Sequence, residues 1–258
     1  MEQQFMLHVD DLDISCRLTR PMSGEARHVV LGVHGITGSA DDEIQTSIAE
    51  EMALFGAAMF RFDFPAHGQS PVDSAAFTLE NCKKTLITVA AHAKEQYPEV
   101  ENLCIFATGF GAYVTLVSLE ALLRLPGKIR LVIQTPSVRM AETLLSMTRK
   151  SVQTLRVEDH YTFKVARPLT VNYSLYQELK RNVAMDSYPI PMLILQGEKD
   201  DYINMDDIQN FKRINEDSKL VVIPGASHRF EEEGAWEMVL DLTRDWFEFE
   251  QVLLSDWY

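Results

Sequence analysis

The stretch LCIFATGFGAY, residues 103–113, joins a short apolar run to a second apolar segment through a turn that contains two glycines. The run Leu103 to Phe106 has the length and composition of a strand buried on both faces of a parallel sheet. The segment from Phe110 to Leu123 has the length and spacing of a helix. A strand that turns sharply into a helix places the turn residue, Gly109, at the carboxyl edge of the sheet, where ligands bind in folds of this class.

Strands and helices alternate on both sides of this stretch. The expected strands are 5–9, 12–18, 28–33, 57–62, 103–106, 129–134, 192–196 and 220–223, and the expected helices are 42–55, 79–93, 110–123, 140–149, 174–182, 205–214 and about 231–247. The first two strands alternate apolar with polar residues, as antiparallel strands do, whereas the later ones are almost wholly apolar. The pattern predicts an α/β fold with a mostly parallel, twisted sheet of about eight strands and helices on both faces.

The alternation is interrupted between about residues 135 and 188. We therefore expect residues 1–134 and 189–258 to form the core, and residues 135–188 to form a small cap inserted over the carboxyl ends of the strands.

Composition excludes several classes of function. The 258 residues include 24 Lys and Arg against 38 Asp and Glu, a formal net charge of −14, which opposes nucleic acid or an anionic membrane as the main partner. No apolar run approaches the roughly 18 residues of a membrane span. The three cysteines, Cys16, Cys82 and Cys104, are odd in number and far apart, so we expect no disulfide framework, no zinc site and a cytoplasmic location. Nucleotide-binding glycine motifs are missing, so no cofactor is expected. We expect a monomer or a homodimer.

Three further loops with chemically capable residues follow predicted strands. The first, 33–39, reads VHGITGS, and its two glycines leave backbone N–H groups that could stabilise an oxyanion, although an ordinary turn fits equally well. The second places Asp200 in an acidic loop, and the third places His228 just beyond the last strand. If both meet Gly109 at one edge of the sheet, Asp200 can orient His228, and His228 can act as a general base.

A fourth loop, FDFPAHGQS at 62–70, has a different interpretation. Asp63 closes an apolar strand and His67 follows a proline, an arrangement typical of a loop held by side-chain hydrogen bonds. We expect both residues to be structural.

Together these loops resemble the α/β-hydrolase superfamily over essentially the whole chain, in the order elbow, Asp, His. The set is most similar to small bacterial carboxylesterases of the cinnamoyl and feruloyl esterase type and to monoacylglycerol-lipase-like enzymes, which begin with an HG[FI]TG turn. The resemblance implies that the Ile36 and Phe110 N–H groups form the oxyanion hole, that Asp200 is the acid and that His228 is the base. Asp201 is a neighbouring alternative to Asp200, although the spacing from Gly197 favours Asp200.

The chain departs from this family at the nucleophile. The family elbow is G-x-S-x-G, whereas residues 107–111 read ATGFG, so Gly109 stands where the serine belongs. Gly relieves the backbone strain of an elbow but has no side chain that attacks a carbonyl. Thr108, Cys104, Ser70 and Ser227 are possible substitutes, but none combines an accessible side chain with the elbow position.

These residues predict a carboxylic-ester hydrolase scaffold that is close to inactive, through either a natural or a deliberate loss of serine. The intact Asp200, His228 and oxyanion turn favour a recent or deliberate loss. The alternative is a non-catalytic protein that binds a small molecule on the same fold. Haloalkane or epoxide chemistry needs an Asp in the elbow, and Gly109 supports an ancestral Asp no better than an ancestral Ser.

The expected ligand is a small ester, with short acyl or hydroxycinnamoyl groups as candidates. Aromatic rings with polar tips suit a flat, partly polar acyl group, but the same rings could simply pack the cap onto the core. The candidates for ligand contact are His34, Tyr161, Phe163, Tyr173 and Tyr176.

Overall fold

A computed structural model describes residues 2–22 and 24–249 of the chain. Its centre is an eight-stranded sheet with the order β1-β2-β4-β3-β5-β6-β9-β10. The strands are β1 (Glu2–Val9), β2 (Leu12–Thr19), β3 (His28–Val33), β4 (Ala57–Phe62), β5 (Asn102–Thr108), β6 (Lys128–Gln134), β9 (Met192–Gly197) and β10 (Lys219–Ile223). Strands β1 and β2 are antiparallel to their neighbours, and the other six run parallel. The predicted fold class and strand number are therefore confirmed.

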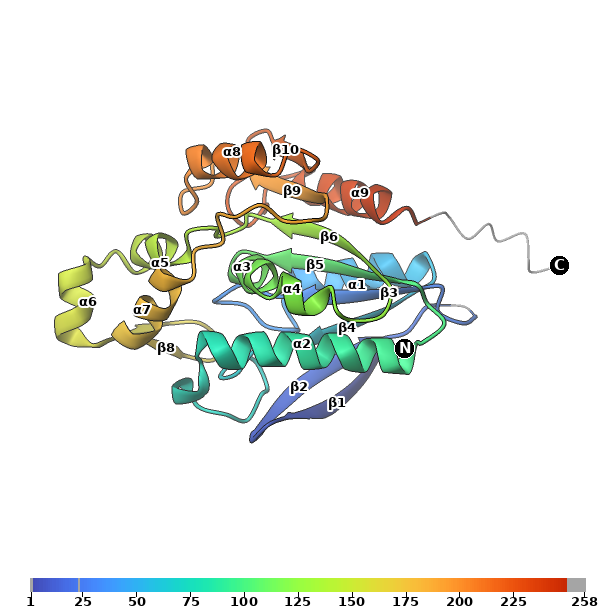
Figure 1. Ribbon diagram of the computed structural model, residues 1–258, viewed down its shortest axis with the longest axis horizontal. Coiled ribbons are helices and arrows are strands. Elements are labelled where there is room, and N and C mark those ends of the chain that lie inside the picture. Colours follow the sequence, from blue (N-terminus) through green and yellow to red (C-terminus); the bar gives the residue numbers. More distant parts are fainter. Residues whose placement is uncertain (1, 23, 250–258) are drawn as a thin grey trace.

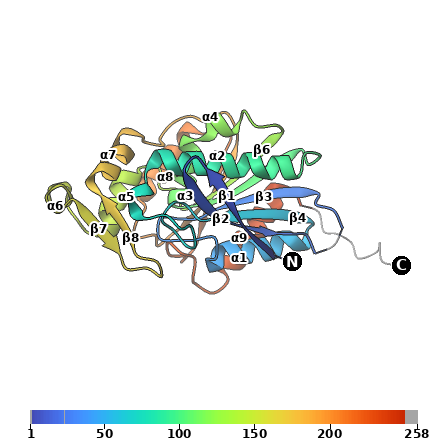
Figure 2. The ribbon, with the colours of Figure 1, turned by 90° about the horizontal axis from the view of Figure 1, so that it is seen from below.

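Helices cover both faces of the sheet. They are α1 (Glu43–Leu54), α2 (Leu79–Gln96), α3 (Phe110–Val117), α4 (Leu119–Leu122), α5 (Met140–Thr148), α6 (Val152–Glu158), α7 (Tyr173–Arg181), α8 (Met205–Ile214) and α9 (Ala235–Phe247), with a short 3₁₀ turn at Ser74–Ala76. Helices α1 and α9 lie on one side of the sheet and α2 on the other (Figure 2). The buried apolar residues accordingly form two clusters, one on each face.

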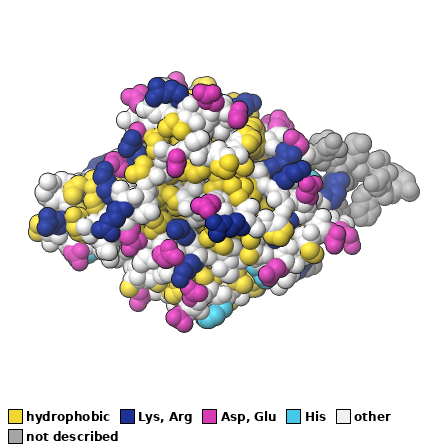
Figure 3. Space-filling model, in the orientation of Figure 1, with side chains coloured by type: hydrophobic (Ala, Val, Ile, Leu, Met, Phe, Trp, Pro, Cys, Tyr) yellow, Lys and Arg dark blue, Asp and Glu magenta, His cyan; other side chains and the backbone are white. Residues whose placement is uncertain are grey.

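The central strands are apolar on both faces because both faces are covered. Every residue of β4 is buried, and so is most of β3 and β5, as a parallel sheet between two helical layers requires. Strand β1, at the edge of the sheet, is mostly exposed at its amino end. On the face that Figure 3 shows, hydrophobic side chains gather over the middle, between α2 and α8.

Most predicted helices differ from the structure by one to three residues at an end, and two differ more substantially. The helix expected over 110–123 is divided at Ser118 into α3 and α4. Thr115 Oγ1 donates to the Gly111 carbonyl at 2.8 Å, a side-chain bond of the kind that bends helices. The last helix begins at Ala235 rather than near residue 231, because Gly234 before it adopts a left-handed conformation (φ +76°).

The segment 135–188 contains helices α5, α6 and α7 and a small antiparallel hairpin, β7 (His160–Phe163) with β8 (Leu169–Asn172). Helices α5 and α7 were expected, whereas α6 and the hairpin were not. In Figure 1 these elements lie together at one end of the molecule, beyond the sheet. Several of their residues line the same cavity as the carboxyl ends of β5 and β6, so the segment lies beside the edge where the candidate site is found.

Candidate active site

The turn between β5 and α3 holds the backbone of Gly109 in a conformation that residues with a side chain rarely adopt. Its φ is +50° and its ψ is −111°, and its N–H donates to Gln134 O at 2.9 Å. A Cβ atom added to Gly109 would have its nearest heavy atom, Gly35 Cα, 4.0 Å away. The turn is therefore an elbow whose conformation would strain any residue with a side chain, and it has open space where that side chain would project.

The same elbow requires glycine at position 111 for another reason. A Cβ atom there would lie 2.5 Å from both His34 O and Val33 O, which are backbone atoms at the end of β3. The absence of a side chain at Gly111 lets α3 approach the loop after β3 closely, as helix–strand packing at a turn of this kind demands.

Asp200 and His228 are paired by a hydrogen bond. His228 Nδ1 lies 2.8 Å from Asp200 Oδ2, as the sequence analysis predicted for this pair. Asp200 also accepts hydrogen bonds from Gln196 Nε2 and from the backbone N–H groups of Tyr202 and Ile203. The exposed fraction of its side chain is only 1%. The carboxylate thus has enough donors to stay charged while buried.

The pKa of Asp200 is set by burial on one side and by its hydrogen-bond donors on the other. Burial by itself would raise the pKa, but the hydrogen bond and charge of His228 and the backbone N–H groups of Ile203 and Tyr202 lower it below the ordinary value. Ionised Asp200 accepts from Nδ1–H of His228, so the other ring nitrogen, Nε2, carries the lone pair. That arrangement gives His228 the tautomer of a general base. Asp201, the neighbouring alternative, is exposed and makes no comparable bond with His228 in the described residues.

A cavity of about 790 Å³ joins these groups. Its lining includes Gly109, His228, Ile36 and Phe110. Phe110 begins α3, so its N–H has no partner within the helix. The Ile36 N–H makes no hydrogen bond with any described residue. The residues that carry the two backbone donors and the imidazole therefore line one cavity, and Asp200 bonds to the Nδ1 side of the His228 ring.

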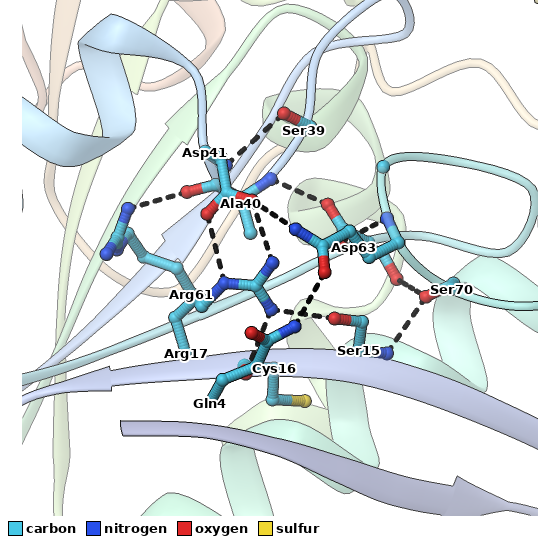
Figure 4. Close-up of polar contacts among 12 residues, drawn as sticks. Gln4, Ser15, Cys16, Arg17, Ser39, Ala40, Asp41, Arg61, Asp63 and Ser70 are labelled. Atoms are coloured by element: carbon cyan, nitrogen blue, oxygen red, sulfur yellow. Dashed lines mark hydrogen bonds and ion pairs between the residues drawn. The ribbon is translucent and has the colours of Figure 1, made fainter. Parts of the chain in front are cut away.

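The loop that carries Ile36 is held by a buried polar network (Figure 4). Asp63 accepts from Ala40 N at 2.8 Å and from Gln69 N at 2.9 Å, and Arg61 Nη1 donates to Ala40 O at 2.6 Å. The ring nitrogens of His67 lie 2.9 Å from Pro65 O and 2.8 Å from Ile36 O. Asp63 and His67 thus have the structural role expected of them, fixing the loop that presents the Ile36 N–H.

His34 lies behind the cavity rather than in it. Its Nδ1 donates to Gly35 O at 2.7 Å, and its Nε2 accepts from Phe64 N at 3.0 Å. Burial lowers the pKa of His34 to about 4, so the ring is neutral, as this pair of bonds requires. With both nitrogens engaged and the side chain buried, His34 supports the turn after β3 and is not placed for contact with a ligand.

Of the four aromatic candidates for ligand contact in residues 135–188, one lines the cavity and three do not. Phe163 lines the cavity. Tyr161 packs edge-on against Phe163, with ring centroids 5.0 Å apart, and Tyr173 stacks with Tyr176 at 5.8 Å. The three tyrosines contact the main apolar core and are not among the cavity lining, so packing accounts for them.

Among the alternative nucleophiles, Thr108 lines the cavity but stands one residue before the elbow position. The other three are unsuited to attack. Burial raises the pKa of the Cys104 thiol to about 12. Ser70 is buried, and its hydroxyl donates to Asp63 O and accepts from Ser15 N. Ser227 lies outside the lining.

Several lining residues were missed in the sequence. They include Trp236, Tyr202, Phe230 and Met147, together with a set of acidic residues at the rim. Tyr202 and Phe230 stand two residues after Asp200 and His228, and these positions could have signalled that they line the cavity. Trp236 and Met147 approach the cavity only through tertiary packing. Within the described ranges no helix has the length and apolar character to cross a membrane. Nor do three His, Cys, Asp or Glu side chains of that part of the chain cluster as metal ligands would.

Comparison with known proteins places the fold. No protein-family model matches the chain, and no curated protein sequence matches it either. Among solved structures, Est1E from Butyrivibrio proteoclasticus with bound ferulic acid is similar with a TM-score of 0.81 and 18% identity, over 96% of this chain and 99% of that one.

Two other structures are similar over nearly their whole length. A putative hydrolase from Agrobacterium vitis S4 has a TM-score of 0.82 and 16% identity, over 97% of this chain and 100% of its own. Mouse alpha/beta hydrolase domain-containing protein 10 has a TM-score of 0.75 and 14% identity, over 95% and 98%. At these identities the likeness concerns architecture, and together with the strand order and the strained elbow it establishes that the chain has the α/β-hydrolase fold.

Proposed function

We propose that this chain is a carboxylic-ester hydrolase of the serine-esterase type in which the nucleophile position is occupied by Gly109. Esters with short acyl or hydroxycinnamoyl groups are the expected ligands, and their turnover is expected to be close to nil. The observation that carries the proposal is the elbow itself. Gly109 has the positive φ of an elbow residue with free space beyond it, in the same cavity as His228, Ile36 and Phe110.

The chemistry that the site would perform with a serine follows from its groups. His228 Nε2 would take the hydroxyl proton while the serine oxygen attacks the ester carbonyl, and the N–H groups of Ile36 and Phe110 would hold the oxyanion. His228 would then return the proton to the departing alkoxide, leaving an acyl-enzyme that water hydrolyses by the same sequence. With Gly109 the first bond cannot form at the elbow position, because glycine has no side-chain atom to attack. Binding and oxyanion stabilisation are all that the site retains.

The test is a gain of function in Gly109→Ser. Gly109→Ala is the matched control, because it adds the same backbone strain and a Cβ atom but no hydroxyl. We expect the Ser variant to hydrolyse 4-nitrophenyl acetate on the order of 10³-fold or more faster than the Ala variant, since losing a nucleophile costs on the order of 10⁶ in kcat. Adding His228→Ala to Gly109→Ser should remove the gain. A folded Ser variant no faster than the Ala variant would overturn the proposal.

The second candidate is a non-catalytic protein that binds a small molecule. The cavity of about 790 Å³ favours it, because the space for a ligand persists without the nucleophile. The Gly109→Ser experiment distinguishes the two functions. A failed gain of function in a protein that still binds small esters would leave the binding protein as the better description.

A further inference from the structure

The rim of the cavity carries an excess of negative charge. Six carboxylates and one guanidinium belong to its lining: Asp42, Glu43, Glu231, Glu232, Glu233, Glu237 and Arg229. Asp42 and Glu43 come from the start of α1, Arg229 and Glu231 to Glu233 from the segment between β10 and α9, and Glu237 from the first turn of α9.

Half of these carboxylates are already engaged with protein groups. Asp42 accepts from Ser39 N, Glu232 accepts from Ser227 N, and Glu231 lies 3.7 Å from Arg229. Glu43, Glu233 and Glu237 take part in no ion pair within residues 2–22 and 24–249. These three carboxylates thus have neither an ion pair nor a side-chain hydrogen bond among the described residues.

An independent observation inside the cavity also points to a ligand. Gln134, at the end of β6, lines the cavity, and its exposed fraction is 1%. Its side-chain oxygen is buried and accepts no hydrogen bond from the described residues. A buried acceptor without a donor is costly, so a ligand with an N–H or O–H group would satisfy it.

Aromatic side chains complete the lining. Trp236 stands one residue before Glu237 at the start of α9, and Phe163, Phe230 and Tyr202 line the same space. Tyr202 meets the His228 ring edge-on, with centroids 5.1 Å apart. Aromatic faces attract cations, alkylammonium groups above all, and nearby carboxylates add to that attraction.

We propose that the cavity selects ligands that carry a cationic alkylammonium group and discriminates against anionic ones. That the cationic ligand is an ester rests on the proposed function, whereas the charge preference itself is a property of binding. An ammonium group at the rim would lie among Glu233, Glu237 and Trp236, while the acyl part reaches toward Gly109.

The experiment compares two ligands of equal shape. Acetylcholine carries a quaternary ammonium, and 3,3-dimethylbutyl acetate has carbon in place of the nitrogen. Calorimetric titration of the protein as it exists, with Gly109, measures binding without turnover. We expect acetylcholine to bind about tenfold tighter, the discrimination of a partly desolvated cation–π and carboxylate contact.

Matched variants separate the rim from the net charge of the molecule. Glu233→Gln with Glu237→Gln should reduce the preference at least about threefold. Glu95→Gln with Glu99→Gln removes the same charge at exposed positions outside the lining and should leave the preference unchanged. Equal binding of the two ligands, binding of neither, or an equal loss in both variant pairs would overturn the proposal.

The two proposals fail separately. Activity of Gly109→Ser without a preference for acetylcholine would remove the cationic ligand and keep the esterase. A charge preference in binding without activity of Gly109→Ser would remove the esterase and keep the cationic ligand.

Discussion

Adding a side chain to the elbow should cost stability at two positions for two different reasons. At Gly109 the added Cβ meets no atom closer than 4.0 Å, so only the left-handed backbone is penalised. That strain is about 1–3 kcal/mol. For a chain of this size each kcal/mol lowers Tm by about 2–4 °C. We therefore expect Gly109→Ala and Gly109→Ser to melt roughly 2–12 °C below the parent.

At position 111 we expect glycine to be more stabilising than alanine, the opposite of their helix propensities. Alanine inside a helix is favoured over glycine by about 1 kcal/mol, so an exposed Gly111 would gain from the change. Here its Cβ would lie 2.5 Å from two backbone oxygens, those of Val33 and His34. Neither can move without shifting the end of β3 and the turn that follows it. We expect Gly111→Ala to lose about 3 kcal/mol or more, more than either variant at Gly109.

The assay is urea unfolding followed by circular dichroism, with thermal melts as a second measurement. The parent, Gly109→Ala, Gly109→Ser and Gly111→Ala are compared under one buffer condition. A Gly111→Ala protein as stable as the parent would refute the close approach of α3 to β3. A loss at Gly109 as large as that at Gly111 would refute the open space beyond the elbow.

The remaining predictions concern buried polar groups. Asp63→Asn should lower the free energy of unfolding by about 2 kcal/mol, because one of two backbone N–H groups loses its charged acceptor, and an unchanged urea midpoint would contradict the network of Figure 4. Asp200→Asn should destabilise the protein above the ordinary carboxyl pKa of 3.8, since the lowered pKa of Asp200 stabilises the fold there and that contribution is lost as the pH falls through the folded value. The stability difference between parent and variant should therefore shrink under acid unfolding, and a difference that grows would give the wrong sign. Finally, the thiols should resist a disulfide reagent at about pH 8 until the protein unfolds, because all are buried and their pKa values are raised, those of Cys16 and Cys104 to about 12. Rapid modification of the folded protein would contradict their burial.

Much of the fold was predictable because the central strands are buried on both faces. The apolar runs at 28–33 and 57–62 match β3 and β4 at both ends. Their composition reflects two helical layers, a constraint local enough to be visible in six residues. The hairpin of β7 and β8 was missed because its strands are four residues long and partly exposed, so neither carries a complete alternation.

The sequence by itself determined which chemical groups are available: a strand–turn–helix with Gly109 at the turn, and Asp200 and His228 after later strands of the same sheet. Parallel strands bring their carboxyl ends to one edge of the sheet. For this reason Gly109, Asp200 and His228 were expected together, although 91 positions separate the first two and 28 positions the last two.

Only the tertiary structure decided which neighbours share the cavity. Asp200 rather than Asp201 faces His228, and His34 turns inward to the backbone of Gly35 and Phe64. Phe163 reaches the cavity while the nearby tyrosines pack the core, and carboxylates from the start of α1 and from residues 231–237 gather at the rim. The physical reason is that a side chain's direction depends on how its element packs against distant ones. Residue type and spacing within one segment do not contain that information.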